Sequence, residues 1–203
     1  MLLTLDPTYH AALDRQWDQL GRPGARLTSR ERISLAAAAR AARRGETPDL
    51  DIHPAMLEAA RTFAADPAAP RADWVASLAQ RGVDAASYVE ILSLVARLSA
   101  IDTLLFGLGQ PERPLPDVQP GAPTGAIDPT ARIDGGFAPT VGAAFPTTAL
   151  TMLTGEQDTM FDLHGALYLS IEEMADLGVV KDLDRRQMEL VAARTSLLND
   201  CFF

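Results

Sequence analysis

The chain has 203 residues, a formal net charge of −9, 47% hydrophobic residues and 6% aromatic residues. This acidic balance argues against a nucleic-acid backbone or an anionic membrane surface as a partner, and no apolar run approaches the ~20 residues that a membrane helix needs. The single cysteine excludes an internal disulfide framework and suits a reducing compartment. The start of the chain lacks the basic segment of a secretory signal. The sequence therefore predicts a cytoplasmic, alanine-rich, all-α protein.

Helical periodicity runs through the first half of the chain, interrupted by glycines and prolines. Asp6 is expected to cap the first predicted helix, with Pro7 at its first position, and Thr28 with Glu31 forms a capping box for the second. The most regular apolar pattern lies in the fifth predicted helix. The predicted helices cover residues 7–20, 28–44, 53–65, 73–81 and 84–106.

A change of composition then divides the chain. Residues 110–146 are rich in proline and glycine and lack helical periodicity, which predicts an extended strap or linker. Helical patterns return over 148–169 and again around 171–177, before a final helix that starts at an Asp184-x-x-Gln187 capping box. We therefore predict a helical core in 1–109, a linker in 110–146 and a partial second helical unit in 147–203.

The final predicted helix and the residues after it contain a spacing that suggests a function. Glu189 and the only cysteine, Cys201, stand twelve positions apart, and Asn199 lies just before the cysteine. This segment resembles the alkylhydroperoxidase D-like (AhpD-like) and carboxymuconolactone decarboxylase superfamily, in which a helical glutamate precedes a Cys-x-x-Cys pair and a histidine. The second cysteine would be residue 204, so we expect the native chain to continue past Phe203. The first unit also resembles an AhpD-like helical bundle, but with Ile33 and Gly45 at the glutamate and cysteine positions.

The resemblance implies a thiol-dependent peroxidase that needs no cofactor. Cys201 would attack a hydroperoxide, a second thiol would form a disulfide with it, and an external thiol reductant would restore both. Glu189 would assist proton transfer. Members of the superfamily commonly assemble through their helices, so the resemblance also implies a homo-oligomer, as a dimer, trimer or hexamer.

Other interpretations remain open at this stage. A lone cysteine after a helix is often a small buried hydrophobe, and Glu189 can equally be a surface carboxylate beside Arg185, Arg186 or Arg194. Twelve residues of straight helix span ~18 Å, so Glu189 reaches Cys201 only if the chain turns back at Asn199. A non-catalytic helical oligomerisation or partner module is the main alternative function, and lactone decarboxylation is a third.

A metal site is not expected. His10, His53 and His164 are isolated in the sequence, with no cysteine, histidine or carboxylate at metal-ligand spacing.

Overall fold

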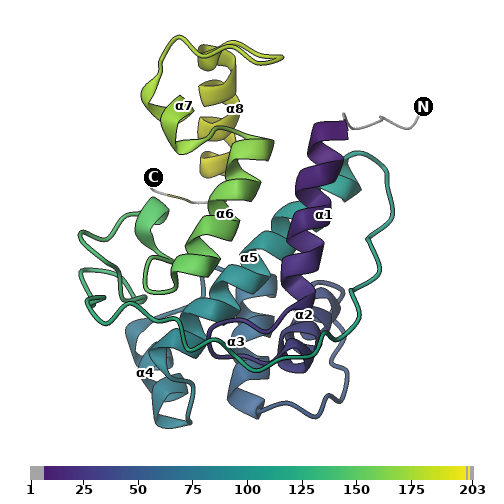
Figure 1. Ribbon diagram of the computed structural model, residues 1–203, viewed down its shortest axis with the longest axis vertical. Coiled ribbons are helices and arrows are strands. Elements are labelled where there is room, and N and C mark those ends of the chain that lie inside the picture. Colours follow the sequence, from purple (N-terminus) through teal and green to yellow (C-terminus); the bar gives the residue numbers. More distant parts are fainter. Residues whose placement is uncertain (1–6, 200, 202–203) are drawn as a thin grey trace.

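The computed structural model describes residues 7–199 and 201, and this part of the chain contains eight α-helices and no sheet (Figure 1). The all-α prediction is confirmed. Asp6, which was expected to cap the first helix, lies outside the described residues. The elements in chain order are α1 (Pro7–Gly21), α2 (Ser29–Arg43), α3 (Pro54–Ala65), α4 (Ala72–Gln80), α5 (Ala85–Gly107), the 3-10 turn η1 (Pro146–Thr148), α6 (Thr154–Leu167), α7 (Ile171–Ala175) and α8 (Arg185–Leu198).

Capping residues set the helix starts that the sequence predicted. Thr28 and Glu31 form the expected capping box of α2, and the Asp84 side chain accepts a hydrogen bond from the Ser87 backbone at the start of α5. Asp184 and Gln187 cap α8 in the same reciprocal way. In each case a side chain satisfies backbone N–H groups that have no partner within the helix.

One helix is shorter than its pattern predicted. The expected helix over 148–169 begins only at Thr154, because the six residues before it form the 3-10 turn and further turns. The Thr148 hydroxyl donates to the Ala143 carbonyl at 2.8 Å, and the Thr151 hydroxyl donates to the Thr148 carbonyl at 2.7 Å. Such local bonds from hydroxyl side chains compete with helix formation.

The main core lies between α2, α3 and α5. Five alanines of α2 and α3 have no exposed surface, which lets the helices pack closely around large residues of α5 such as Ile91 and Leu94. They are Ala36, Ala38, Ala39, Ala59 and Ala60. Phe63 closes the core with edge-on contacts to Trp74 and Tyr88, at ring-centroid distances of 5.9 and 5.4 Å. None of the described helices is long and apolar enough to cross a membrane.

Residues 110–146 run as an extended strap over the helices rather than away from them (Figure 1). The Trp17 indole donates to the Pro114 carbonyl at 2.6 Å, and backbone bonds of 2.9 Å join Thr124 to Gly24 and Gly125 to Ala25. Helix α6 follows the strap and packs against α1 and α5. The proposed division of the chain into two units stays a prediction.

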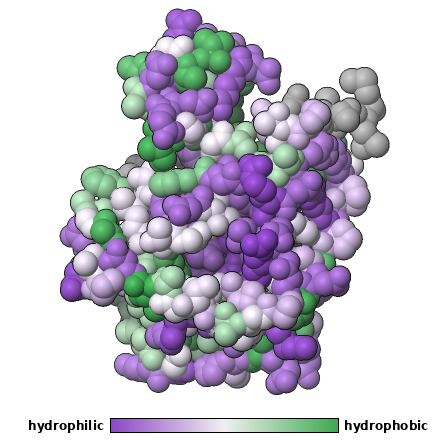
Figure 2. All heavy atoms as spheres, in the orientation of Figure 1, coloured by the Kyte–Doolittle hydropathy of each residue, from purple (hydrophilic) through white to green (hydrophobic). Residues whose placement is uncertain are grey.

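Helices α7 and α8 form a lobe beyond the end of α6, which we call the C-terminal lobe (residues 168–199; Figure 1). Within α8, all of whose residues the structure describes, only Met188 is buried. Figure 2 shows hydrophobic side chains exposed on this lobe. The most exposed of them are Leu177 (80%), Leu190 (72%), Leu198 (68%), Val180 (68%) and Leu197 (67%).

Candidate functional site

The first turns of α8 hold the carboxylate that the sequence singled out. One oxygen of Glu189, Oε1, accepts a hydrogen bond from the Tyr168 hydroxyl at 2.9 Å and another from Arg185 Nε at 2.6 Å. Both hydrogen bonds lower the pKa of Glu189, and the bond from Tyr168 has the larger effect. Burial, together with the neighbouring Glu189, raises the pKa of Tyr168. The pair therefore consists of an ionised carboxylate and a protonated phenol at neutral pH.

Arg185 fixes this group on the lobe. Its Nη1 donates to the carbonyl oxygens of Glu173 and Asp176 at 3.1 and 3.3 Å, and its Nη2 donates to that of Met174 at 3.4 Å. These carbonyls lie at the C-terminal end of α7, where a cation is favoured. Arg185 thus joins α7 to α8 and orients Glu189 at the same time.

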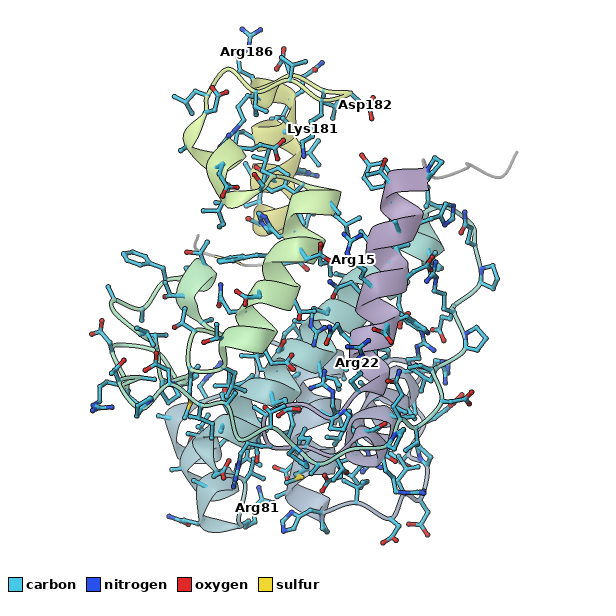
Figure 3. The ribbon with its side chains drawn as sticks, in the orientation of Figure 1. Arg15, Arg22, Arg81, Lys181, Asp182 and Arg186 are labelled. Atoms are coloured by element: carbon cyan, nitrogen blue, oxygen red, sulfur yellow. The ribbon has the colours of Figure 1, made fainter. Side chains whose placement is uncertain are left out.

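A cavity of about 520 Å³ lies beside the Tyr168–Glu189 pair. Its walls are mostly apolar and come from α8, the end of α6 and the loop before α8; Tyr9 of α1 also contributes. Tyr168 and Lys181 are polar members of the lining, and Ser196 lines the cavity from the last turn of α8. Figure 3 shows Lys181 and Asp182 in the outer part of the lobe, below Arg186. A ligand here would contact Tyr168 directly and Glu189 through it.

Cys201 lies at the opposite end of α8 from Glu189 and is exposed. Its backbone N–H donates to the Ser196 carbonyl at 2.9 Å, so the chain stays at the C-terminal end of the helix. Glu189 is nine residues before Leu198, the last helical residue, a separation of ~14 Å along the helix axis. The structure therefore does not bring the two predicted site residues together, and Cys201 does not begin a helix within the described residues.

Glu189 also makes the contact that the alternative interpretation expected. Its ion pair with Arg185 at 2.6 Å is an (i, i+4) pair on a helix surface, and its side chain is 49% exposed. Arg186 and Arg194, the other candidates, do not pair with it in any contact that the structure records; Arg186 pairs with Asp184 at 3.3 Å.

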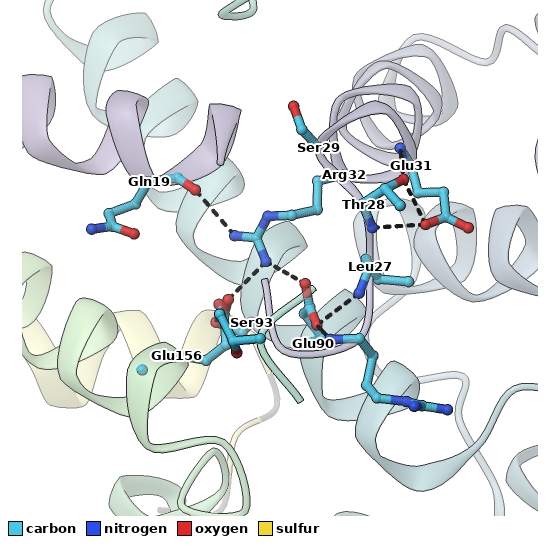
Figure 4. A network of polar contacts seen from close by, with 12 residues as sticks. Gln19, Leu27, Thr28, Ser29, Glu31, Arg32, Glu90, Ser93 and Glu156 are labelled. Atoms are coloured by element: carbon cyan, nitrogen blue, oxygen red, sulfur yellow. Dashed lines mark hydrogen bonds and ion pairs between the residues drawn. The ribbon is translucent and has the colours of Figure 1, made fainter. Parts of the chain in front are cut away.

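A second group of charges, which the sequence analysis missed, is buried in the core (Figure 4). Arg32 Nη1 bridges two carboxylates, with 2.5 Å to Glu90 Oε1 and 2.7 Å to Glu156 Oε1. Arg97 and the Ser93 hydroxyl donate to the other oxygen of Glu156 at 2.5 and 2.7 Å. We call these five residues the buried ionic network. It joins α2, α5 and α6.

The network is electrically balanced and tightly enclosed. Burial would raise the pKa of Glu156, but Arg97 and Arg32 outweigh it and lower the value to about 2. For Glu90 burial prevails over the attraction of Arg32, and the pKa is raised. A Cβ added at Gly24 would come within 1.8 Å of Glu90 Oε1, so the backbone passes directly over the ion pairs. This enclosure favours a structural role over a catalytic one.

Among the described residues, no group of three or more His, Cys, Asp or Glu side chains is placed to hold a metal ion. His53 Nδ1 instead accepts the backbone N–H of Ala55, and His164 Nδ1 lies 2.6 Å from the Leu169 carbonyl oxygen. Comparison with known proteins found no matching family model, no matching curated protein and no matching solved structure.

Proposed function

We propose that this chain belongs to a thiol-dependent peroxidase of the AhpD-like and carboxymuconolactone decarboxylase type, with Cys201 as the attacking thiol. The main support is the arrangement on α8. One helix carries a carboxylate that Tyr168 and Arg185 keep ionised, lines an apolar cavity, and ends next to the exposed cysteine. A cavity of this size with a few polar groups suits a small organic substrate.

The chemistry has two steps. The Cys201 thiolate attacks the terminal oxygen of a hydroperoxide ROOH, the O–O bond breaks, and one proton is taken up, which gives a sulfenic acid and the alcohol ROH. A second thiol then displaces water from the sulfenic acid and forms a disulfide, which an external dithiol reduces. This second thiol would be the cysteine that the resemblance implies at residue 204, or a thiol of another chain.

The role of Glu189 depends on how the thiol reaches it. Because ~14 Å of helix separates the carboxylate from the end of α8, it cannot exchange a proton directly with Cys201 in the arrangement described above. It would act on Cys201 of another chain, or on Cys201 after a turn at Asn199. Tyr168, which donates to Glu189 and lines the cavity, would take part in the same proton transfer.

The proposal is tested by the reaction of Cys201 itself. The protein is treated with cumene hydroperoxide at pH 7, and the sulfenic acid is trapped with dimedone and located by mass spectrometry. We expect Cys201 to react at least ~10-fold faster than free cysteine, and Glu189→Gln to slow the reaction ~10-fold or more. Glu172→Gln, which removes an exposed carboxylate of α7, is the matched control and should leave the rate unchanged. A Cys201 that reacts no faster than free cysteine would overturn the proposal.

The second candidate is a non-catalytic helical assembly module. It is favoured by the exposed apolar residues of α8, a helix that buries one side chain and leaves Leu190, Leu197 and Leu198 about two-thirds exposed or more. Exposed apolar patches of this kind commonly mark interaction surfaces. Normal assembly of a Cys201→Ser variant, combined with the absence of any hydroperoxide reaction in the wild type, would favour this candidate.

A further inference from the structure

Tyr88, near the start of α5, has a buried phenol without a hydrogen-bond partner. The residue is 6% exposed, and its ring packs edge-on against Phe63 at a centroid distance of 5.4 Å. Within the described part of the chain, no group forms a hydrogen bond with its hydroxyl, and burial raises the pKa of Tyr88 to about 12. Buried phenols normally have a partner. The proton of Tyr88 is therefore available to a molecule from outside the chain.

Tyr88 lies where two cavities meet. One cavity, of about 550 Å³, runs along α5 from Tyr88 to Thr103. The other, of about 400 Å³, lies between the start of α5 and the end of the strap. Tyr88, Leu92 and Phe137 line both. Because the Tyr88 oxygen is not fully enclosed, it faces this shared space, from which a bound molecule can extend into both cavities.

The lining of the joined cavities is mostly apolar and offers no unpaired charge. Two charged residues, Arg43 and Asp134, belong to it. Arg43 pairs with Asp102, and Asp134 Oδ2 accepts a hydrogen bond from the backbone N–H of Ala144 at 3.2 Å. A charged ligand would lose its hydration here without gaining an ion pair, so the site favours a neutral one.

The longer cavity is a recess between separate parts of the same chain. Ala96 lies on its floor, Phe63 and Pro67 contribute to the walls from α3 and the loop after it, and Asn199 contributes from the end of α8. Phe137 of the strap lines the end next to Tyr88. A recess with a small residue on its floor and aromatic walls suits a small organic molecule.

We propose that the joined cavities bind a neutral carbonyl compound, a ketone or an ester, in which the carbonyl group lies between two apolar parts. The carbonyl oxygen accepts a hydrogen bond from the Tyr88 hydroxyl. One apolar part lies over Ala96 in the longer cavity, and the other extends beside Phe137 into the shorter one. The inference does not depend on the proposed peroxidase reaction, because the cavity discussed for that reaction lies in the C-terminal lobe.

The hydrogen bond is tested with two probes of nearly the same shape. Benzophenone has a carbonyl group between two phenyl rings, and diphenylmethane lacks the oxygen. By equilibrium dialysis we expect the wild type to bind benzophenone with a dissociation constant of ~100 μM or lower. Tyr88→Phe keeps the ring and should raise this constant ~3–10-fold, since one hydrogen bond is lost. Diphenylmethane should bind the variant at least as well as the wild type.

The position of the ligand is tested by filling the recess. Ala96→Trp places a large ring on the floor and should weaken the binding of both probes ~10-fold or more, because the space is then occupied. Ala76→Trp, on the exposed side of α4, is the matched control and should leave both dissociation constants unchanged. Circular dichroism of each variant checks that the helices are retained.

Photolabelling identifies the site directly in the wild-type chain. Near-ultraviolet light attaches bound benzophenone to neighbouring C–H bonds, and we expect the labelled peptides to contain Leu92 or Phe137. Labels confined to residues 181–196 would assign the binding to the C-terminal lobe and overturn the proposal. So would a wild type that binds no benzophenone at ~200 μM protein, or a Tyr88→Phe variant that binds it as tightly as the wild type.

Discussion

The core and the C-terminal lobe differ in which residues they bury: the core encloses charged side chains, whereas the lobe exposes apolar ones. In the core, Arg32, Arg97, Glu90 and Glu156 are almost completely enclosed, and each has a charged partner within 2.7 Å. In the lobe, α8 exposes most of its leucines, and its ion pairs lie at the surface. The same kind of contact, an arginine on a glutamate, therefore has different consequences in the two regions. In the core the pairing offsets the cost of burying four charged side chains, whereas in the lobe it orients a half-exposed carboxylate.

The comparison is tested most strongly by removing one carboxylate from each region. Glu156→Ala leaves Arg32 and Arg97 facing each other in the core without their shared partner, and we expect the free energy of unfolding to fall by ~3–5 kcal/mol. Glu189→Ala removes a half-exposed carboxylate from the lobe and should lower it by less than ~1 kcal/mol. Urea titrations at pH 7 measure both. Equal losses for the two variants would show that the enclosure of the network does not matter.

The second prediction concerns acid. The pKa of Glu156 is about 2 in the folded protein and near 4.5 in an unstructured chain, so Glu156 stabilises the fold above pH ~4.5. This contribution, about 3 kcal/mol, is lost as the pH falls from 4.5 towards 2. The raised pKa of Glu90 acts in the opposite direction, because protonating that residue is easier in the folded state.

Urea titrations at pH 7, 4 and 3 measure this loss. In Glu156→Gln the dependence on pH below 4.5 should be weaker, since the group that takes up the proton is gone. A variant whose stability falls with acid as steeply as the wild type would assign the acid sensitivity to other carboxylates.

Helix positions followed from the sequence much more closely than the buried charges did. Thr28, Asp84 and Asp184 cap helices through contacts within three residues, so local sequence is sufficient to find them. The buried ionic network joins Arg32 to Glu90 and Glu156, which lie 58 and 124 positions away. No local pattern encodes such pairs. The one available signal was Glu90 itself, a carboxylate between Val89 and Ile91 on α5, the most apolar of the described helices.

At the candidate site on α8, too, the sequence predicted local features but not contacts between distant residues. Its capping box and the spacing of Glu189 and Cys201 are visible in the sequence, but the hydrogen bond from Tyr168 crosses 21 positions and was not foreseen. Nor does spacing along the chain show whether a helix continues or turns. The unbroken α8 leaves Glu189 and Cys201 at opposite ends, and the sequence had left that point open.

The smallest expected effect separates the two sides of α8. Met188 is 8% exposed and is the buried residue of that helix, whereas Leu190 is 72% exposed. Met188→Ala should reduce the hydrogen-exchange protection of α8 by ~2 kcal/mol, because it leaves a cavity on the buried side of the helix. Leu190→Ala should change it by less than ~0.5 kcal/mol in the monomer, since little contact is lost.

Exchange is best measured at low protein concentration, where contacts between copies are fewest. If Leu190→Ala lowers the protection of α8 as much as Met188→Ala does, then Leu190 is covered in solution, and the exposed side of the lobe is an interface after all. Because a covered surface would protect α8 more at higher concentration, repeating the measurement at ~10-fold higher protein distinguishes a partner copy from packing within one chain.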